Sequence, residues 1–323
     1  MSLLRKKQER KQGLKILVYG VNGSGKSVYG LSFPEVAVLD AEAKVGVYES
    51  SEKHGKNIVA VADTSSYYDT LEVLEEVIKT KACKTFMIDS ETYVYEAMQV
   101  SAMEVEEERA RKKGNDPTDQ AISVRGYGKI KLNTARLRGL KAQASSNGIT
   151  LIVTAHKEDI MQKVGQDNVK VGEKPALRKN SEHEYDVVLR FFKEKDLATG
   201  KIKYKAEVEK DTTETFEVGN IIENPNYENT FKSYIERTSK LETVKSSYDK
   251  TIETTMETMT NEAKDFDELV VEFETLFKTL KDKDANNLNV VKDLLSKNGI
   301  TSYKKPECYD NLKVVVGELK KLV

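Results

Sequence analysis

The sequence predicts an α/β fold with a mainly parallel sheet flanked by helices, followed by a small helical module. Short apolar segments alternate with helical patterns over about the first 190 residues, which is typical of a parallel sheet. A glycine-rich loop follows the first apolar segment, and residues 240–323 are almost entirely helical in pattern. In such sheets ligands bind at the carboxyl ends of the strands, so polar residues at those ends are the candidate site.

The elements are assigned in chain order from apolar periodicity and breaker residues. Strands are predicted at 14–19, 36–39, 57–62, 84–88 and 149–154. Helices are predicted at 26–32, 68–79, 92–113 and 129–145. Loops are predicted at 114–127, which starts at a Gly-Asn-Asp-Pro breaker, and at 157–182, which is polar and weakly periodic. Residues 186–192 and 202–209 alternate like the two strands of a hairpin.

Three parts of the chain are expected: a basic N-terminal arm at 1–13, an α/β core at 14–235 and a helical module at 236–323. The apolar residues predicted to form the core of the helical module are Leu294, Leu295, Val314, Val315, Val316, Leu319 and Leu322. The stretch 251–287 carries ten acidic and four basic residues, so this module begins with a strongly acidic segment.

Composition excludes several classes of protein. The net charge is −1, which excludes a polycation that coats nucleic acid by charge alone. No apolar run of about 18 residues is present, so no membrane span and no membrane partner are expected. The basic N-terminus lacks the apolar segment of a signal peptide. Cys83 and Cys308 form neither a disulfide framework nor a metal-spaced pair, which fits a reducing cytoplasm, and three histidines leave little room for a zinc site.

The strongest motif is G-x-x-x-x-G-K-S at residues 20–27, directly after an apolar strand and before a predicted helix. Glycines let several backbone N–H groups face one phosphate, the lysine places a positive charge on the β- and γ-phosphates, and the serine hydroxyl ligates Mg²⁺. The cofactors expected are therefore ATP and Mg²⁺. The nucleotide-binding residues predicted are Gly20, Val21, Asn22, Gly23, Ser24, Gly25, Lys26, Ser27 and Val28, with Lys26 also counted as catalytic.

Carboxylates follow two of the predicted strands. Asp89 ends the strand at 84–88 and is the predicted magnesium acid beside Ser27. Hydrolysis also needs a carboxylate that positions a water in line with the γ-phosphate. Glu42, after the strand at 36–39, and Glu91, after Asp89, both fit that role, and spacing alone does not choose between them.

The order of these motifs resembles the RecA-like ATPases, and more closely the phage-encoded RecA-like P-loop nucleotide-binding proteins of the single-strand annealing and recombination type. The resemblance rests on the phosphate loop, Asp40-Ala41-Glu42, Ile88-Asp89-Ser90 and the segment 153–158, and it covers residues 14–210. It implies a RecA-like P-loop NTPase core in which Glu42 is the catalytic base. It also implies that His156, at the tip of the strand at 149–154, is a catalytic residue that senses the γ-phosphate.

The middle of the chain is basic. Residues 121–180 hold twelve basic and four acidic residues, net +8, which would attract a phosphate backbone. The alternative is a solvated face balanced by the acidic segment of the helical module. The resemblance implies that the loops at 114–127 and 157–182, which come after the strands at 84–88 and 149–154, line a DNA channel. The DNA-binding candidates are therefore Arg125, Tyr127, Lys129, Lys163 and Lys170. It also implies a cation donated to the neighbouring subunit's ATP site, for which the candidates are Lys174, Arg178 and Lys179.

The function predicted is an Mg-ATP-hydrolysing ATPase that acts with single-stranded DNA in phage recombination or replication, in the cytoplasm of a bacterial host cell. The expected partners are single-stranded DNA, further copies of the chain, and phage single-strand-binding or recombination proteins. The alternative is a nucleotide-gated protein-binding switch or loader with little turnover. A P-loop kinase, which would typically carry an arginine-rich lid and an acceptor pocket, fits less well, because the Glu42 arrangement and the basic loops favour hydrolysis near DNA. A GTPase fits less well because no N-K-x-D motif is present.

Overall fold

The computed structural model describes residues 7, 9, 11–165, 167–242, 248–284, 287–304 and 308–322, with the backbone alone for 248–265. The chain divides into two compact units, Met1–Tyr248 and Asp249–Val323. Most of the predicted basic arm at 1–13 lies outside the described residues. The boundary predicted between residues 235 and 236 falls inside helix α6 (Lys232–Ser239), which belongs to the first unit.

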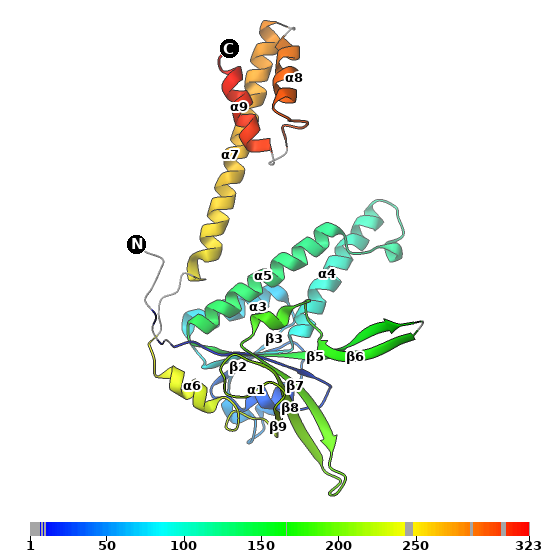
Figure 1. The fold of residues 1–323 in the computed structure, drawn as a ribbon, viewed down its shortest axis with the longest axis vertical. Coiled ribbons are helices and arrows are strands. Elements are labelled where there is room, and N and C mark those ends of the chain that lie inside the picture. Colours follow the sequence, from blue (N-terminus) through cyan, green and yellow to red (C-terminus); the bar gives the residue numbers. More distant parts are fainter. Residues whose placement is uncertain are drawn as a thin grey trace. The chain divides into compact units, whose positions relative to one another are not determined.

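The first unit is built on a nine-stranded, mostly parallel sheet, as predicted (Figure 1). Its strands run in the order β3-β2-β4-β5-β1-β7-β8-β9, and β6 pairs with the extended part of β5. The strands from β3 to β7 in this order are parallel, and β8 and β9 are antiparallel. The strand bounds are Lys15–Gly20 (β1), Val36–Asp40 (β2), Ile58–Asp63 (β3), Thr85–Asp89 (β4), Thr150–Val164 (β5), Asp167–Pro175 (β6), Val187–Lys195 (β7), Ile202–Asp211 (β8) and Ile221–Glu223 (β9).

Helices cover both faces of the sheet, because alternate residues of each buried strand point to opposite sides. Leu17 and Tyr19 of β1 pack on one side with α3 (Tyr67–Thr80), α4 (Glu91–Lys112) and α5 (Val124–Ser146). Ile16 and Val18 pack on the other side with α1 (Lys26–Leu31) and the segment around Tyr227. The short α2 (Gly46–Glu49) follows β2 at the carboxyl edge. Two apolar layers therefore hold the sheet rigidly beneath its carboxyl edge.

The position of β5 between β1 and β4 decides where the candidate residues meet. Gly20 at the end of β1 lies beside His156 on β5, and Asp40 at the end of β2 lies beside Asp89 on β4. The glycine-rich loop after β1, His156 on β5 and both acidic strand ends therefore share one edge of the sheet.

The loop predicted at 157–182 is wrong over most of its length, up to Pro175. β5 continues to Val164 and forms an antiparallel hairpin with β6, turning at Gly165, whose φ is +65°. Most side chains of this hairpin are exposed on both faces, so its sequence carries no alternation of buried and exposed residues for a strand pattern to reveal. The loop predicted at 114–127 also ends early, because Ser123 caps α5 by accepting a hydrogen bond from the Gly126 N–H (3.1 Å).

The second unit contains α7 (Tyr248–Lys283, begun by the last residue of the first unit), α8 (Asn287–Lys297) and α9 (Tyr309–Leu319). Their shared core includes Phe273, Val291, Leu312 and Val315. Within the part of the chain that the structure describes, no helix is long and apolar enough to cross a membrane.

Candidate nucleotide site

The phosphate loop adopts a conformation that depends on its glycines. Gly23 and Gly25 have φ values of +68° and +96°, in the left-handed region that side chains disfavour. A Cβ atom on Gly20 would lie 2.0 Å from the carbonyl oxygen of Phe191 on the neighbouring strand β7. Gly25 immediately precedes α1, so the loop runs directly into a helix amino terminus.

Lys26 is folded back onto this loop. Its Nζ donates to the carbonyl oxygens of Gly20 (3.1 Å) and Val21 (3.0 Å). Burial lowers the pKa of the Lys26 ammonium, and the nearby charges of Asp89 and Glu42 offset part of that effect. A bound polyphosphate would supply the opposite charge that this half-desolvated cation needs.

A cavity of about 290 Å³ opens beside the loop. Seven of the nine predicted nucleotide-binding residues line it, and the other two, Gly20 and Val21, hold Lys26 through their carbonyls. The full lining is Asn22, Gly23, Ser24, Gly25, Lys26, Ser27, Val28, Glu42, Lys44, Val47, Tyr48, Asp89 and His156. Residues from four different strand ends and loops therefore converge on the phosphate loop.

Asp89 lies at the base of the cavity and is almost fully buried. Burial raises the pKa of its carboxyl group, while hydrogen bonds from Thr154 and Ser27 oppose the shift. Among the described residues, no three His, Cys, Asp or Glu side chains gather closely enough to hold a metal by themselves. This donor set fits a cation such as Mg²⁺ that takes a few protein oxygens, here Ser27 and Asp89, and receives its other ligands from nucleotide phosphates and water.

The site and the sheet agree with the comparison of the chain with known families. Residues 12–219, about two thirds of the chain, match the AAA domain family. The chain belongs to this family. Membership indicates a P-loop NTPase domain, and such a domain implies nucleotide binding with a metal, typically Mg²⁺. A search of curated proteins found no match to the chain.

Glu42 and His156 meet at the cavity of the AAA domain. Asp40 accepts hydrogen bonds from the N–H groups of Glu42 (3.2 Å) and Val45 (2.6 Å), which fixes the turn after β2. Glu42 Oε1 then lies 2.8 Å from His156 Nε2, and Glu42 Oε2 accepts from Lys44 Nζ at 2.6 Å. Burial raises the pKa of Glu42, but the hydrogen bond from Lys44 and the positive charge of that ammonium help to outweigh it, so the pKa lies below its ordinary value. Glu42 is therefore a carboxylate at neutral pH.

Glu91, the other candidate base, does not line the cavity. Its carboxylate pairs with the buried ammonium of Lys141 (2.9 Å) and accepts a hydrogen bond from the Tyr185 hydroxyl (3.1 Å). Lys141 also pairs with Glu184 at 3.2 Å, so Glu91 belongs to a charged group that ties α4 to α5 and to the segment before β7. Of the two acids that spacing left open, only Glu42 lines the cavity, and the role of catalytic base stays a prediction.

Sequence reasoning missed the residues that position this site in the AAA domain. The His156 N–H donates to Thr92 Oγ1 (3.0 Å), and the His156 ring packs edge-on against Tyr93 with centroids 5.5 Å apart. Thr154 donates to Asp89. A threonine inside an otherwise apolar strand was the available signal for Thr154, whereas Thr92 and Lys44 have no distinctive pattern around them.

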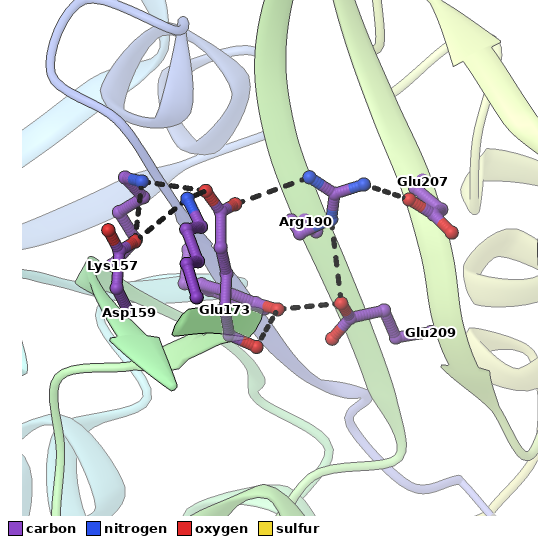
Figure 2. Close-up of polar contacts among 8 residues, drawn as sticks. Lys157, Asp159, Glu173, Arg190, Glu207 and Glu209 are labelled. Atoms are coloured by element: carbon purple, nitrogen blue, oxygen red, sulfur yellow. Dashed lines mark hydrogen bonds and ion pairs between the residues drawn. The ribbon is translucent and has the colours of Figure 1, made fainter. Parts of the chain in front are cut away.

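A second network begins at the residue after His156. Lys157 donates to Asp159 (2.8 Å) and Glu173 (2.6 Å), which joins the two strands of the β5–β6 hairpin. Figure 2 shows the Arg190 guanidinium between Glu173 on one side and Glu207 and Glu209 on the other. The network therefore anchors the β5–β6 hairpin to strands β7 and β8. Lys157, its first member, directly follows His156, the predicted sensor of the γ-phosphate.

Glu173 gives this network a measurable pH dependence. Hydrogen bonds from Lys157 and Lys170 lower the pKa of Glu173 from 4.5 to about 2. Because the pKa is depressed in the folded protein, the ion pairs stabilise the fold fully above pH 4.5. The stabilisation is lost as the pH falls toward 2. We therefore expect Glu173→Gln to lower the melting temperature at pH 6, with a difference from the wild type that shrinks steadily between pH 4.5 and pH 3.

The control for this experiment is Glu158→Gln, which removes the same charge from the same hairpin at a side chain that is about half exposed. Its melting temperature should stay close to that of the wild type throughout. A Glu173→Gln difference that does not change with pH would contradict the assigned ion pairs.

The remaining predicted residues lie outside the cavity. Arg125, Tyr127 and Lys129 are exposed on the first turns of α5, whereas Lys163 and Lys170 lie on the β5–β6 hairpin. Lys170 is paired with Asp159 (3.0 Å) and Glu173 (2.6 Å). The five DNA-binding candidates thus belong to two separate protrusions of the AAA domain (Figure 1).

The three candidates for a cation donated in trans also lie away from the cavity of their own chain. Lys174 pairs with Glu158 (3.3 Å), and Arg178 pairs with Glu184 (3.5 Å). Lys179 is exposed. A role for any of them in a neighbouring subunit stays a prediction.

A larger cavity of about 880 Å³ adjoins the first one. The two share Gly23, Ser24, Gly25, Val28 and Tyr48. The larger cavity is lined further by aromatic and amide side chains, including Phe191, Tyr204, Asn224, Asn226 and Tyr227. A nucleotide whose phosphates follow the loop of the AAA domain has room for its ribose and base here.

Proposed function

We propose that the chain is an Mg-ATP hydrolase of the RecA-like type that acts with single-stranded DNA in recombination or replication. The observation that carries the hydrolase assignment is the contact between Glu42 and His156 at the cavity of the phosphate loop. An ionised carboxylate beside a γ-phosphate site can orient a water and accept its proton. The histidine that holds the carboxylate is on the strand next to the loop, between it and Asp89.

Each residue has a distinct part in this proposal. Lys26 holds the β- and γ-phosphates, and Glu42 orients the attacking water and takes its proton. Mg²⁺, when bound, neutralises charge on the phosphates, with Ser27 and Asp89 as the residues that would hold it. His156 contacts Glu42 directly, so loss of the γ-phosphate can change the hydrogen bond between them. Because His156 is part of β5, that change can alter the position of this strand.

The DNA assignment is supported by the charge on α5. Residues Val124–Ser146 include six basic residues and no acidic residue; Lys141 is buried and paired, which leaves five to charge the surface. The exposed bases Arg125 and Lys129 have no carboxylate within ion-pair distance among the described residues. Tyr127 lies between them with 58% of its surface exposed and can stack on a base. The Lys170 ammonium, in contrast, is already paired, so α5 is the stronger of the two candidate surfaces.

We expect the double variant Arg125→Ala/Lys129→Ala to bind single-stranded DNA more weakly than the wild type in the presence of Mg-ATP. Each lost phosphate contact should lower the slope of log K against log salt by roughly 0.7, so the pair should lower it by about 1.4. Fluorescence anisotropy with a labelled oligonucleotide at several salt concentrations measures both quantities.

The charge-matched control is Lys278→Ala/Lys281→Ala, which removes two exposed lysines from α7 in the second unit. It should retain the wild-type slope. Equal slopes for the two double variants would remove α5 from the proposal, and wild-type binding that does not respond to salt would remove the DNA assignment altogether.

We further propose that the active form is a homo-oligomer. This rests on the RecA-like type, in which ATP sites lie between subunits, and on the bases that lie away from their own cavity. We also propose phage single-strand-binding or recombination proteins as partners, because the chain resembles the phage-encoded RecA-like proteins.

A further inference from the structure

We propose that Lys193 is a second phosphate-binding cation of the nucleotide site, supplied by the β7–β8 hairpin of the same chain. This inference rests on the proposed ATP-binding function and assigns a residue that no motif contains. It differs from a cation donated across a subunit boundary, because Lys193 already lies at the loop of its own chain.

The geometry comes from two glycines of the phosphate loop. A Cβ atom on Gly23 would lie 3.7 Å from Lys193 Nζ, and one on Gly25 would lie 3.7 Å from Cδ1 of Tyr204. Lys193 and Tyr204 are directly paired across β7 and β8, so their side chains share one face of the hairpin. That face therefore looks onto the phosphate loop and brings a cation and an aromatic ring to it.

The hairpin is fixed in this position by its own base. Phe191, two residues before Lys193 and on the same face, is buried and packs edge-on against Tyr29 of α1 with ring centroids 5.3 Å apart. Its carbonyl oxygen lies against Gly20 at the start of the loop. Lys193 is therefore only two residues from the buried Phe191, within a stretch of β7 that is paired with β8. This pairing keeps the Lys193 side chain near the loop.

The charge of Lys193 is available to a ligand. Two lysines of the facing strand β8 are paired: Lys203 with Asp196 (3.4 Å), and Lys205 with Glu194. Lys193 is exposed and has no carboxylate within ion-pair distance in the part of the chain that the structure describes. An unpaired ammonium beside a loop built for anions gains a partner when a polyphosphate binds.

The location also fits a polyphosphate rather than a base. Gly23 lines both the 290 Å³ cavity, where Lys26 and Asp89 lie, and the 880 Å³ cavity, where Tyr204 lies. A nucleotide that occupies both would run past the residues that the two cavities share, and Gly23 is one of them. The side chain of Lys193 lines neither cavity, but its Nζ lies 3.7 Å from a Cβ atom placed on Gly23, which lines both.

The test is the Kd of Mg-ATP, measured by calorimetry at low salt for the wild type, Lys193→Ala, Lys193→Arg and Lys195→Ala. Lys195 is the matched control, because it is an exposed lysine on the same strand and face, two positions nearer the turn. We expect Lys193→Ala to raise the Kd about tenfold, as for the loss of one charge-assisted hydrogen bond. Lys193→Arg should restore most of the affinity, and Lys195→Ala should change the Kd by less than about twofold.

Equal Kd values for Lys193→Ala and Lys195→Ala, with tight binding by the wild type, would overturn this inference and leave the proposed function standing. A wild-type protein that does not bind Mg-ATP would overturn both. Lys26→Ala, measured in the same series, is the blank and should show no measurable binding.

Discussion

Lys26→Ala is expected to remove measurable ATP binding. The Lys26 ammonium is held at the cavity by two loop carbonyls and has its pKa lowered by burial, so it is a cation that lacks an anionic partner within the loop itself. Loss of its contacts with two phosphates should cost about 3 kcal/mol or more, which is about a hundredfold or more in Kd. Calorimetric titration with Mg-ATP measures this directly.

Lys26→Met is the companion variant, because it keeps an unbranched side chain of similar size and removes the ammonium group. Both variants should remain folded, since the wild-type ammonium carries a desolvation cost that neither neutral residue has. Lys79→Ala, at an exposed lysine near the end of α3, is the control and should bind ATP like the wild type. ATP binding by Lys26→Met at wild-type affinity would contradict the assignment of the loop.

Glu42→Gln is expected to stop turnover while it preserves binding. Glutamine keeps the shape of the side chain and can still contact His156 and Lys44, but it cannot accept a proton from water. We expect the rate of ATP hydrolysis to fall by about 10² to 10⁴ and the Kd for Mg-ATP to stay within about threefold of the wild type. Single-turnover hydrolysis and calorimetry separate the two effects.

Glu91→Gln is the matched control, since it makes the same change at the other acid that follows a strand of this edge. It weakens the pairing with the buried Lys141, so its main effect should be a lower free energy of unfolding, by about 1–3 kcal/mol, with hydrolysis retained. Normal hydrolysis by Glu42→Gln together with inactive but folded Glu91→Gln would reverse the two assignments.

The parts of the fold that the sequence predicts well are those whose pattern is local. A short apolar run that ends in glycine or aspartate is recognisable in the sequence as a buried strand. The parallel arrangement of these strands then brings Gly20, Asp40, Asp89 and His156 to one edge of the sheet. The β5–β6 hairpin escaped prediction because it is exposed on both faces, so its residues carry no burial pattern. Periodicity has a related limit in the second unit, where three consecutive valines cannot all face inward on one helix.

The exposed fractions of those three valines illustrate this limit of periodicity. Val315 and Val316 are 0% and 2% exposed, whereas Val314 is 52% exposed, and Leu322, also predicted in the core, is 51% exposed. The site shows the same division between local and long-range information. The loop and its acids follow from motifs, but Lys193 reaches Gly23 from 170 positions along the chain through strand pairing alone, and no local pattern distinguishes it from the other hairpin lysines.

The central claim, that one chain couples ATP hydrolysis at the phosphate loop to single-stranded DNA, is tested most directly by steady-state hydrolysis of Mg-ATP with and without single-stranded DNA, with Lys26→Ala as the blank. We predict hydrolysis above the blank by the wild type and a higher rate when DNA is added. Tight ATP binding with no turnover above the Lys26→Ala blank, whether or not DNA is present, would contradict the claim.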